Sequence, residues 1–374
     1  MDVNDPTTPV WFLPRARSES VLDALRAQGY RCVGPQARDG AIVYDTLEQW
    51  SQLPHGYTEQ QAPGVYRLEI RDHHRAFGWA NGPAALKPLL FAPRETVWRA
   101  EKDEAGALVF RAVMPAPVPL AVIGVRACDV AALRIHDRVF LGQSAHDPYY
   151  AARRAALLLI GVNCSHPADT CFCASTGDGP VIEAGCDVVL TELDDGYLVR
   201  ADSDAGRTLV AALSLDAATD AHHFAAGQQR VAATRAQHRT LPPVERRQQL
   251  MQRLTHPRWD EVAERCLSCG NCTAVCPTCF CHSQHDEPAL DGTHSEHVRE
   301  WDSCFTQKHS YIHGLTVRAE TRTRYRQWLT HKLATWHEQF DTSGCVGCGR
   351  CITWCPVGID LTEEVGVIVG EDAA

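Results

Sequence analysis

The sequence Cys266-Leu-Ser-Cys269-Gly-Asn-Cys272-Thr-Ala-Val-Cys276-Pro277 has a counterpart nearer the C-terminus, Cys345-Val-Gly-Cys348-Gly-Arg-Cys351-Ile-Thr-Trp-Cys355-Pro356. In each of them two residues separate the first three cysteines from one another, three residues lead to the fourth, and a proline follows it. We call them the first run and the second run. Three thiols within seven residues point to a ligand that needs several thiolates at one place.

The spacing of each run is the one with which bacterial ferredoxins bind cubane 4Fe-4S clusters. Three thiolates on a tight turn cap three iron corners of one cubane, and the fourth cysteine of each run crosses to the other cluster. The spacing therefore predicts two neighbouring clusters, between which electrons can pass. The predicted ligands are Cys266, Cys269, Cys272 and Cys355 for cluster I, and Cys345, Cys348, Cys351 and Cys276 for cluster II.

Zinc is the alternative occupant, because it also binds four thiolates tetrahedrally. Zinc sites usually present their cysteines as separated pairs, which differs from the crowded spacing of both runs. The pattern favours iron–sulfur clusters over a zinc-stabilised interaction protein. Colour separates the two classes, because cubane iron–sulfur proteins are brown and zinc proteins are colourless.

Composition limits the class of protein further. The chain has 374 residues, a hydrophobic content of 45% and a formal net charge of −10, which predicts two to three globular domains without the basic footprint of a nucleic-acid-binding protein. No apolar run approaches the roughly 18 residues that span a bilayer, and the acidic start is not a signal peptide. Seventeen cysteines, mostly at metal-ligand spacing, indicate reduced thiolates, so we expect a soluble, cytoplasmic protein that binds no membrane.

Apolar periodicity divides the chain into three expected parts. Residues 1–210 are predicted to form a mixed α/β domain, with strands buried on both faces at residues 120–125 and 156–162 and a hairpin turn at Asp195-Gly196. Residues 211–244 are predicted to be a helical linker that ends at a proline pair. Helical stripes lead into both runs within residues 245–374, and the runs lie far apart, so an all-α ferredoxin-type domain with two 4Fe-4S clusters is predicted there.

A second group of cysteines follows the two apolar strands. Cys128 comes just after the first strand, and Cys164, Cys171 and Cys173 follow the second. If the strands are neighbours, their C-terminal ends bring these thiols to one edge of the sheet, where open α/β folds bind ligands. Two interpretations stay open: a third 4Fe-4S site, or buried cysteines that act as small hydrophobic residues.

Three further cysteines are accessory candidates. The tetrapeptide Thr170-Cys-Phe-Cys173 recurs as Thr278-Cys-Phe-Cys281 directly after the first run, and another cysteine stands in Trp301-Asp-Ser-Cys304. Their spacing does not decide whether they tune cluster I, serve as alternative ligands or pack beside it. The accessory candidates are Cys279, Cys281 and Cys304.

Motifs for other chemistry are absent from the sequence. There is no G-x-G-x-x-G after a strand, no G-x-x-x-x-G-K-[ST] and no nucleophile elbow. We therefore expect no catalytic residues and no dinucleotide site. The chain is expected to carry electrons without holding a hydride carrier.

Together the motifs resemble those of one family, the iron–sulfur beta subunits of cytoplasmic NAD(P)-linked NiFe hydrogenases, or sulfhydrogenase beta subunits, and are similar to the A subunit of anaerobic sulfite reductases. The resemblance covers most of the chain. It rests on Gly124-Val-Arg-Ala-Cys-Asp-Val-Ala-Ala-Leu133, Asp147-Pro-Tyr-Tyr150, Asn163-Cys164, Thr170-Cys-Phe-Cys173, Cys276-Pro-Thr-Cys-Phe-Cys281, Trp301-Asp-Ser-Cys304, Cys345-Val-Gly-Cys-Gly-Arg-Cys-Ile352 and Cys355-Pro-Val-Gly-Ile-Asp360.

The resemblance implies a non-catalytic electron-transfer subunit of an oxidoreductase complex. Its implied partners are an FAD/NAD(P)-binding subunit and the hydrogenase small and large subunits. The alternative within this chemistry is an electron-transfer subunit of an anaerobic sulfite or sulfur reductase, since the two differ only in their partners. One departure is a histidine-rich stretch after Cys304, with His309 and His313, which leaves the electron acceptor open.

Overall fold

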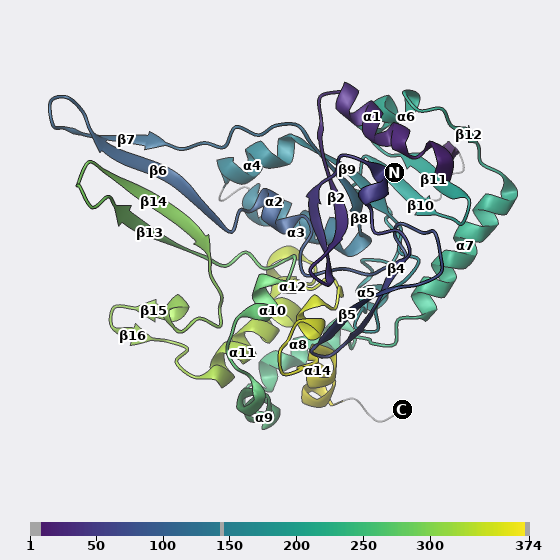
Figure 1. The fold of residues 1–374 in the computed structure, drawn as a ribbon. Helices are drawn as coiled ribbons and strands as arrows, with labels where there is room; N and C mark the ends of the chain where they lie inside the picture. Colours follow the sequence, from purple (N-terminus) through teal and green to yellow (C-terminus); the bar gives the residue numbers. More distant parts are fainter. Residues whose placement is uncertain (1–8, 143–145, 371–374) are drawn as a thin grey trace.

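The computed structural model describes residues 9–142 and 146–370. Its largest element is an eight-stranded mixed sheet with the order β12-β1-β11-β10-β9-β8-β2-β3 (Figure 1). The strands are β1 (Val10–Pro14), β2 (Arg31–Arg38), β3 (Ala41–Thr46), β8 (Leu120–Val125), β9 (Leu157–Val162), β10 (Val188–Glu192), β11 (Gly196–Ala201) and β12 (Asp216–Ala217).

The centre of this sheet is parallel and buried on both faces. Strands β2, β8, β9 and β10 run parallel to one another, and Leu120 of β8 pairs with Leu157 of β9. The two apolar strands are therefore neighbours, a condition that the sequence left open, and the predicted hairpin is confirmed by the antiparallel pair β10 and β11. One face is covered by α1 (Glu19–Ala27) and α6 (Asp204–Ala211), and the other by α2 (Lys87–Leu90), α3 (Ala127–Phe140) and α4 (Pro148–Ala155).

A helical layer surrounds the two cysteine runs. Its core contains the buried residues Trp259, Leu329 and Val365. The short helices α10 and α13 belong to the first and second run and lie against each other. The helices are α8 (Val244–Gln248), η3 (Gln249–Gln252), α9 (Arg258–Arg265), α10 (Asn271–Ala274), α11 (Thr321–Thr330), the π-helical turn η5 (His331–Thr335), α12 (Trp336–Phe340), α13 (Arg350–Thr353) and α14 (Leu361–Val369).

The prediction of an all-α C-terminal domain is wrong, because the chain between the two runs forms strands. The hairpin of β13 (His282–Pro288) and β14 (His294–Trp301) joins β6 (Arg94–Lys102) and β7 (Leu108–Ala112) in a four-stranded sheet of order β13-β14-β6-β7. This sheet reaches away from the rest of the molecule (Figure 1). A smaller hairpin of β15 (Tyr311–Ile312) and β16 (Leu315–Thr316) follows it.

The sequence hid these strands because β13 and β14 are polar at almost every position, so they lack the alternation of apolar residues that marks a strand. Cross-strand polar pairs stabilise the sheet instead. Arg94 of β6 bonds Glu287 of β13 at 2.5 Å, and Thr96 donates to Glu296 of β14 at 3.0 Å. Such pairs leave no hydrophobic period in the sequence.

The remaining elements connect the large sheet to the helical layer. The hairpin of β4 (Tyr57–Ala62) and β5 (Val65–Ile70) touches the second run, where the Gly64 N–H donates to the Ile352 carbonyl at 3.1 Å. The rest are η1 (Arg15–Arg17), η2 (Trp50–Gln52), α5 (Cys173–Thr176), α7 (Asp220–Arg235) and η4 (Gln307–Ser310). The expected domain boundaries stay a prediction. Strands from both sides of the expected linker share the four-stranded sheet.

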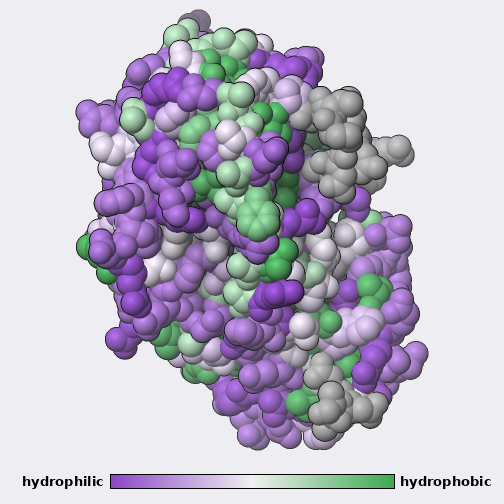
Figure 2. All heavy atoms as spheres, turned by 90° about the vertical axis from the view of Figure 1, so that its right-hand side faces the viewer, coloured by the Kyte–Doolittle hydropathy of each residue, from purple (hydrophilic) through white to green (hydrophobic). Residues whose placement is uncertain are grey.

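Helix α7 lies along one side of the molecule, and Figure 2 looks onto that side. This face is largely hydrophilic, with hydrophobic side chains gathered in its upper and middle part (Figure 2). Within residues 9–142 and 146–370, no helix combines the length and the apolarity that are needed to cross a membrane.

Candidate metal centres

The two cysteine runs adopt the same backbone turn. Positive φ angles occur at the third and fifth positions of both runs, at Ser268 (51°) and Gly270 (75°) in the first and at Gly347 (63°) and Gly349 (72°) in the second. Glycine reaches these left-handed conformations without steric cost. The turn also brings the Ser268 N–H within 3.4 Å of the Cys266 sulfur, the kind of bond that tunes a bound cluster.

The structure places the four predicted ligands of cluster I around one cavity. Its apolar walls include Phe305, Tyr325 and Trp328, and Cys351 of the other predicted ligand set lines it as well. The two predicted sites therefore adjoin each other. The cysteines that line the cavity are Cys266, Cys269, Cys272, Cys351 and Cys355.

The predicted ligands of cluster II also lie close to one another. Burial raises the pKa of Cys345 to about 12, and the neighbouring Cys348 and Cys276 thiolates add to this shift. Burial and the same neighbours raise the pKa of Cys351. Cys276 differs, because a hydrogen bond from Cys279 and the Lys332 ammonium hold its pKa well below the ordinary value.

The second run is covered by the loop that carries the first Thr-Cys-Phe-Cys tetrapeptide. The Phe172 N–H donates to the Gly347 carbonyl at 2.8 Å, and the Thr170 and Thr353 hydroxyls are 2.7 Å apart. The backbones approach so closely that a Cβ atom on Gly349 would lie 2.3 Å from the Thr170 carbonyl oxygen. Residues 343–350 are all buried as a result.

The N-terminal cysteine set comprises Cys128, Cys164, Cys171 and Cys173. Cys128 lies in the first turn of α3 directly after β8, and the other three follow β9, so the two strand ends do bring them to one region. The pKa of Cys171 is raised by burial and then by its neighbours Cys173 and Cys164. Its thiol donates to the Cys348 carbonyl at 3.8 Å, so the set borders the second run.

A buried cation stands beside this set. Arg126 is fully buried and donates through Nη2 to the carbonyls of Phe77 and Trp79, while its Nε and Nη1 have no hydrogen-bond partner within the described residues. Arg126 also counts among the groups that lower the pKa of Cys164, which burial raises. An uncompensated buried charge is costly, which fits a site that holds an anionic group.

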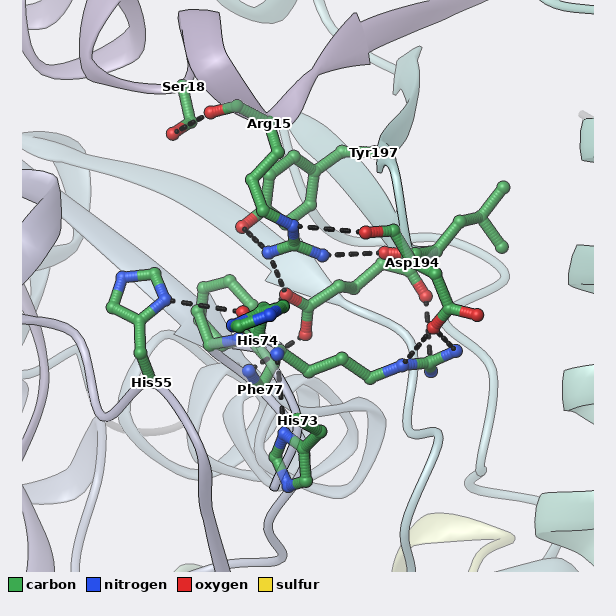
Figure 3. Close-up of polar contacts among 12 residues, drawn as sticks. Arg15, Ser18, His55, His73, His74, Phe77, Asp194 and Tyr197 are labelled. Atoms are coloured by element: carbon green, nitrogen blue, oxygen red, sulfur yellow. Dashed lines mark hydrogen bonds and ion pairs between the residues drawn. The ribbon is translucent and has the colours of Figure 1, made fainter. Parts of the chain in front are cut away.

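A polar network fixes the segment that positions Arg126. The Glu192 carboxylate accepts from the Ala76 and Phe77 N–H groups at 2.7 and 2.8 Å and pairs with Arg15 at 2.8 Å (Figure 3). Arg75 bonds Asp194 at 2.8 Å beside it (Figure 3). These bonds hold the Phe77 carbonyl in place to accept from Arg126.

The accessory cysteines line a second cavity, of about 160 Å³, which we call the accessory pocket. The pocket also contains His309 and Lys332. Hydrogen bonds from Cys304 and His309 lower the pKa of Cys281 to about 4. The bond with Cys281, and a further bond with Asp302, raise the pKa of His309 to about 9.

Sequence reasoning missed the buried cations around the cysteines. Lys332 donates to the Cys276 sulfur at 3.3 Å, and Lys87 donates to the Cys276 carbonyl at 3.3 Å. Arg350 forms a buried ion pair of 2.8 Å with Asp129. The sequence held one weak signal of this burial. Lys332 directly precedes Leu333 in a helical stripe that otherwise packs into the core.

The donor set fits iron–sulfur clusters. The predicted ligands are thiols, the preferred ligands of these clusters, and they stand among apolar walls, N–H donors and buried cations. In the part of the chain that the structure describes, no three His, Cys, Asp or Glu side chains form a group that would hold a single metal ion. The cysteines are grouped around shared spaces rather than around a single point.

Comparison with known proteins agrees with the cysteine spacing. Residues 265–359 match a family model described as a 4Fe-4S dicluster domain. Sulfhydrogenase 2 subunit beta of Pyrococcus furiosus is 31% identical over 284 residues, which cover 73% of this chain and 79% of that protein. No solved structure matches the chain significantly.

Proposed function

The chain belongs to the family of sulfhydrogenase beta subunits, and on this premise we propose that it relays single electrons between the partner subunits of a multi-subunit hydrogenase. The observation that carries the proposal is the cavity lined by four cysteines of one predicted ligand set and by Cys351 of the other. Ligand sets that adjoin in this way hold two 4Fe-4S clusters as neighbours, as in two-cluster ferredoxins.

The bound clusters supply the one-electron redox chemistry, and the protein binds and tunes them. Cys266, Cys269, Cys272 and Cys355 hold cluster I, and Cys345, Cys348, Cys351 and Cys276 hold cluster II. The buried cations Lys332 and Arg350 lie beside the second site and favour the more negative, reduced state. No residue of this chain makes or breaks a substrate bond in this function.

The first run is the side on which a partner exchanges electrons with the chain. Cys269 is exposed, and the neighbouring Leu267 is 63% exposed. Exposed apolar residues beside a redox centre are suited to an interface that comes close to it. We propose an FAD/NAD(P)-binding subunit and a hydrogenase small and large pair as the partners, and the cytoplasm as the location, in keeping with seventeen free cysteines.

Metal analysis tests the cluster assignment. Iron, acid-labile sulfide and zinc are measured on anaerobically prepared chain, and we expect Cys272→Ser and Cys348→Ser each to remove about four iron and four sulfide per chain. Cys32→Ser is the control, because Cys32 packs in the core of the large sheet and lines neither cysteine cavity, so it should leave both contents unchanged. Stoichiometric zinc with little iron would contradict the proposal.

A reduction assay tests the partner assignment. We expect NADPH alone to leave the anaerobic chain oxidised, because the sequence has no dinucleotide motif. Addition of a flavin-containing partner subunit should bleach the visible absorption of the clusters. Bleaching by NADPH without any partner would show that this chain binds the nucleotide itself.

A further inference from the structure

We propose that the accessory pocket binds an additional iron–sulfur cluster, with Cys279, Cys281 and Cys304 as thiolate ligands and His309 as the fourth ligand. This inference goes beyond the two clusters of the dicluster domain and rests on the proposed function only for the source of its electrons. The cluster would exchange one electron at a time with cluster II, without any bond formed or broken.

The pocket has the donors and the room. Cys279 and Cys281 come from the segment after the first run, Cys304 follows β14, and His309 lies in η4, so three separate segments converge on one cavity of about 160 Å³. Three thiolates and an imidazole are soft ligands that select zinc, copper(I) or iron–sulfur clusters. Histidine replaces cysteine as a cluster ligand in known iron–sulfur proteins.

His309 is held as a metal ligand usually is. Its Nδ1 is hydrogen-bonded to the Asp302 carboxylate at 2.9 Å, and the ring also hydrogen-bonds the Cys281 thiol. A ligating histidine almost always bonds a carboxylate or carbonyl through its second nitrogen, which fixes the tautomer and the direction of the ring. Asp302 thereby directs the other ring nitrogen of His309 toward the sulfur atoms of the pocket.

Lys332 requires an anionic neighbour. The side chain is 6% exposed, and its ammonium donates to the Cys276 sulfur at 3.3 Å, the Thr278 hydroxyl at 2.7 Å and the Gly344 carbonyl at 3.2 Å. No carboxylate among the described residues pairs with it. The Cys276 thiolate supplies one negative charge to this buried ammonium, and an anionic cluster in the accessory pocket would supply further negative charge beside it.

The backbone around Lys332 indicates a functional position as well. Lys332 lies in the π-helical turn η5, which interrupts the helical run between α11 and α12. Single π-helical turns of this kind are frequent at functional sites, because they re-aim a side chain. Here the turn places the ammonium between Cys276 of cluster II and the accessory pocket.

The donors of the accessory pocket are not grouped as they are around a single metal ion. Thiolates around one zinc ion stand about 3.7 Å apart, given Zn–S bonds of about 2.3 Å. Among the described residues no three donors form a group that would hold one ion, although the three cysteines share one cavity. Cys281 and Cys304 lie close enough for a hydrogen bond between their thiols, so they would separate to cap two corners of a cubane.

The recurring tetrapeptide supports the same conclusion. Thr170 and Thr278 are both buried, and each bonds through its hydroxyl to the second run or its approach, Thr170 to Thr353 and Thr278 to the Gly344 carbonyl at 2.8 Å. Two copies of one cysteine turn thus flank cluster II. The N-terminal cysteine set and the accessory pocket are linked through one hydrophobic cluster, which contains Cys173 and the pocket residue Trp336.

The test compares variants of the full chain, prepared anaerobically. The double variant Cys279→Ser/Cys304→Ser should lose about four iron and four sulfide per chain relative to the wild type. His309→Cys should keep its iron and lower the potential of one cluster, because thiolate in place of imidazole lowers the potential. Pulsed electron paramagnetic resonance on reduced protein should show nitrogen coupling in the wild type that is lost in His309→Cys and retained in the exposed control His313→Gln.

Several outcomes would overturn the inference. These are an unchanged iron content in the double variant, zinc in place of iron, a Cys281–Cys304 disulfide in the wild type, or no nitrogen coupling. If the double variant does not fold, the His309→Cys measurements decide alone. Failure of this inference is separable from failure of the proposed function, because iron lost in Cys272→Ser and Cys348→Ser but not in the double variant contradicts only the accessory site.

Discussion

The two cysteine runs share a spacing and a backbone turn, yet they lie in opposite surroundings. In the first run Leu267 and Cys269 are exposed, whereas residues 343–350 of the second run are all buried. The cover comes from distant parts of the chain: the loop at residues 170–173, and Gly82, whose carbonyl accepts from Arg350 at 2.9 Å. The motif thus specifies a ligand set, and tertiary structure specifies its environment.

Environment is what distinguishes two clusters of the same type. Solvent exposure, hydrogen bonds to sulfur and nearby charge set the potential of a 4Fe-4S cluster. We therefore expect the exposed first site to meet a partner and the buried second site to pass electrons inward.

The largest effect is expected at the cover of the second run. If the N-terminal cysteine set holds a cluster, Cys171→Ser/Cys173→Ser removes about four iron and four sulfide per chain and leaves the first run loaded. Metal analysis and the spectrum of the reduced protein measure this. An unchanged iron content would show that these cysteines are only packing residues.

Glycine substitutions at the fifth position of each run compare the two environments directly. Gly349→Ala should cost about 4 kcal/mol or more, because its Cβ would lie 2.3 Å from the Thr170 carbonyl oxygen and its φ is 72°. Gly270→Ala, with a φ of 75°, brings its Cβ within 3.0 Å of the Ser303 side chain but of no backbone atom, and should cost about 1–2 kcal/mol. Anaerobic urea unfolding measures both, and equal losses would contradict a tight cover.

The ion pair beside the second run should contribute more to stability than the ion pair beside the first run. Asp129→Asn breaks the buried 2.8 Å pair with Arg350 and should cost about 3 kcal/mol, because it leaves an uncompensated charge. Asp260→Asn breaks the 3.2 Å pair with Arg322 near the first run, where both side chains are exposed, and should cost under about 1 kcal/mol. A similar cost for both would mean that Arg350 is better solvated than its burial implies.

The smallest effect is expected at the contact between the runs. Asn271 of the first run donates from its side chain to the Trp354 carbonyl of the second. Asn271→Ala removes this bond and should cost about 1 kcal/mol without loss of iron. Thermal unfolding of the loaded protein measures the change, and a larger loss that includes iron would show that the bond helps to hold the shared cavity together.

Local signals in the sequence sufficed for the features that short segments determine. The apolar runs at residues 120–125 and 156–162 predicted strands buried on both faces, and Asp195-Gly196 predicted the hairpin. The cysteine spacing singled out the four proposed ligands of cluster I, and these four cysteines line one cavity in the structure. In each case the pattern and its physical cause lie within about ten residues of one another.

Features that depend on distant segments were not predictable in this way. Strands β13 and β14 carry charged residues on both faces, so only the pairing of β14 with β6, which is nearly 200 positions earlier, reveals this hairpin as part of a larger sheet. Lys332 and Arg126 look like ordinary surface cations until the fold buries them. His309 stood out in the sequence, but its role depends on Asp302 and on a pocket built from three segments.

The pairing of β6 with β14 also has a consequence for the synthesis of the chain. Glu101 pairs with His294, so at about 5–20 residues per second β6 waits roughly 10–40 s on the ribosome for its partner strand. An unpaired apolar edge would invite aggregation during that time, but β6 carries Arg94, Glu95, Arg99, Glu101 and Lys102, and charged edges resist it. The charges that conceal this sheet from sequence analysis thereby protect the nascent chain until β14 emerges.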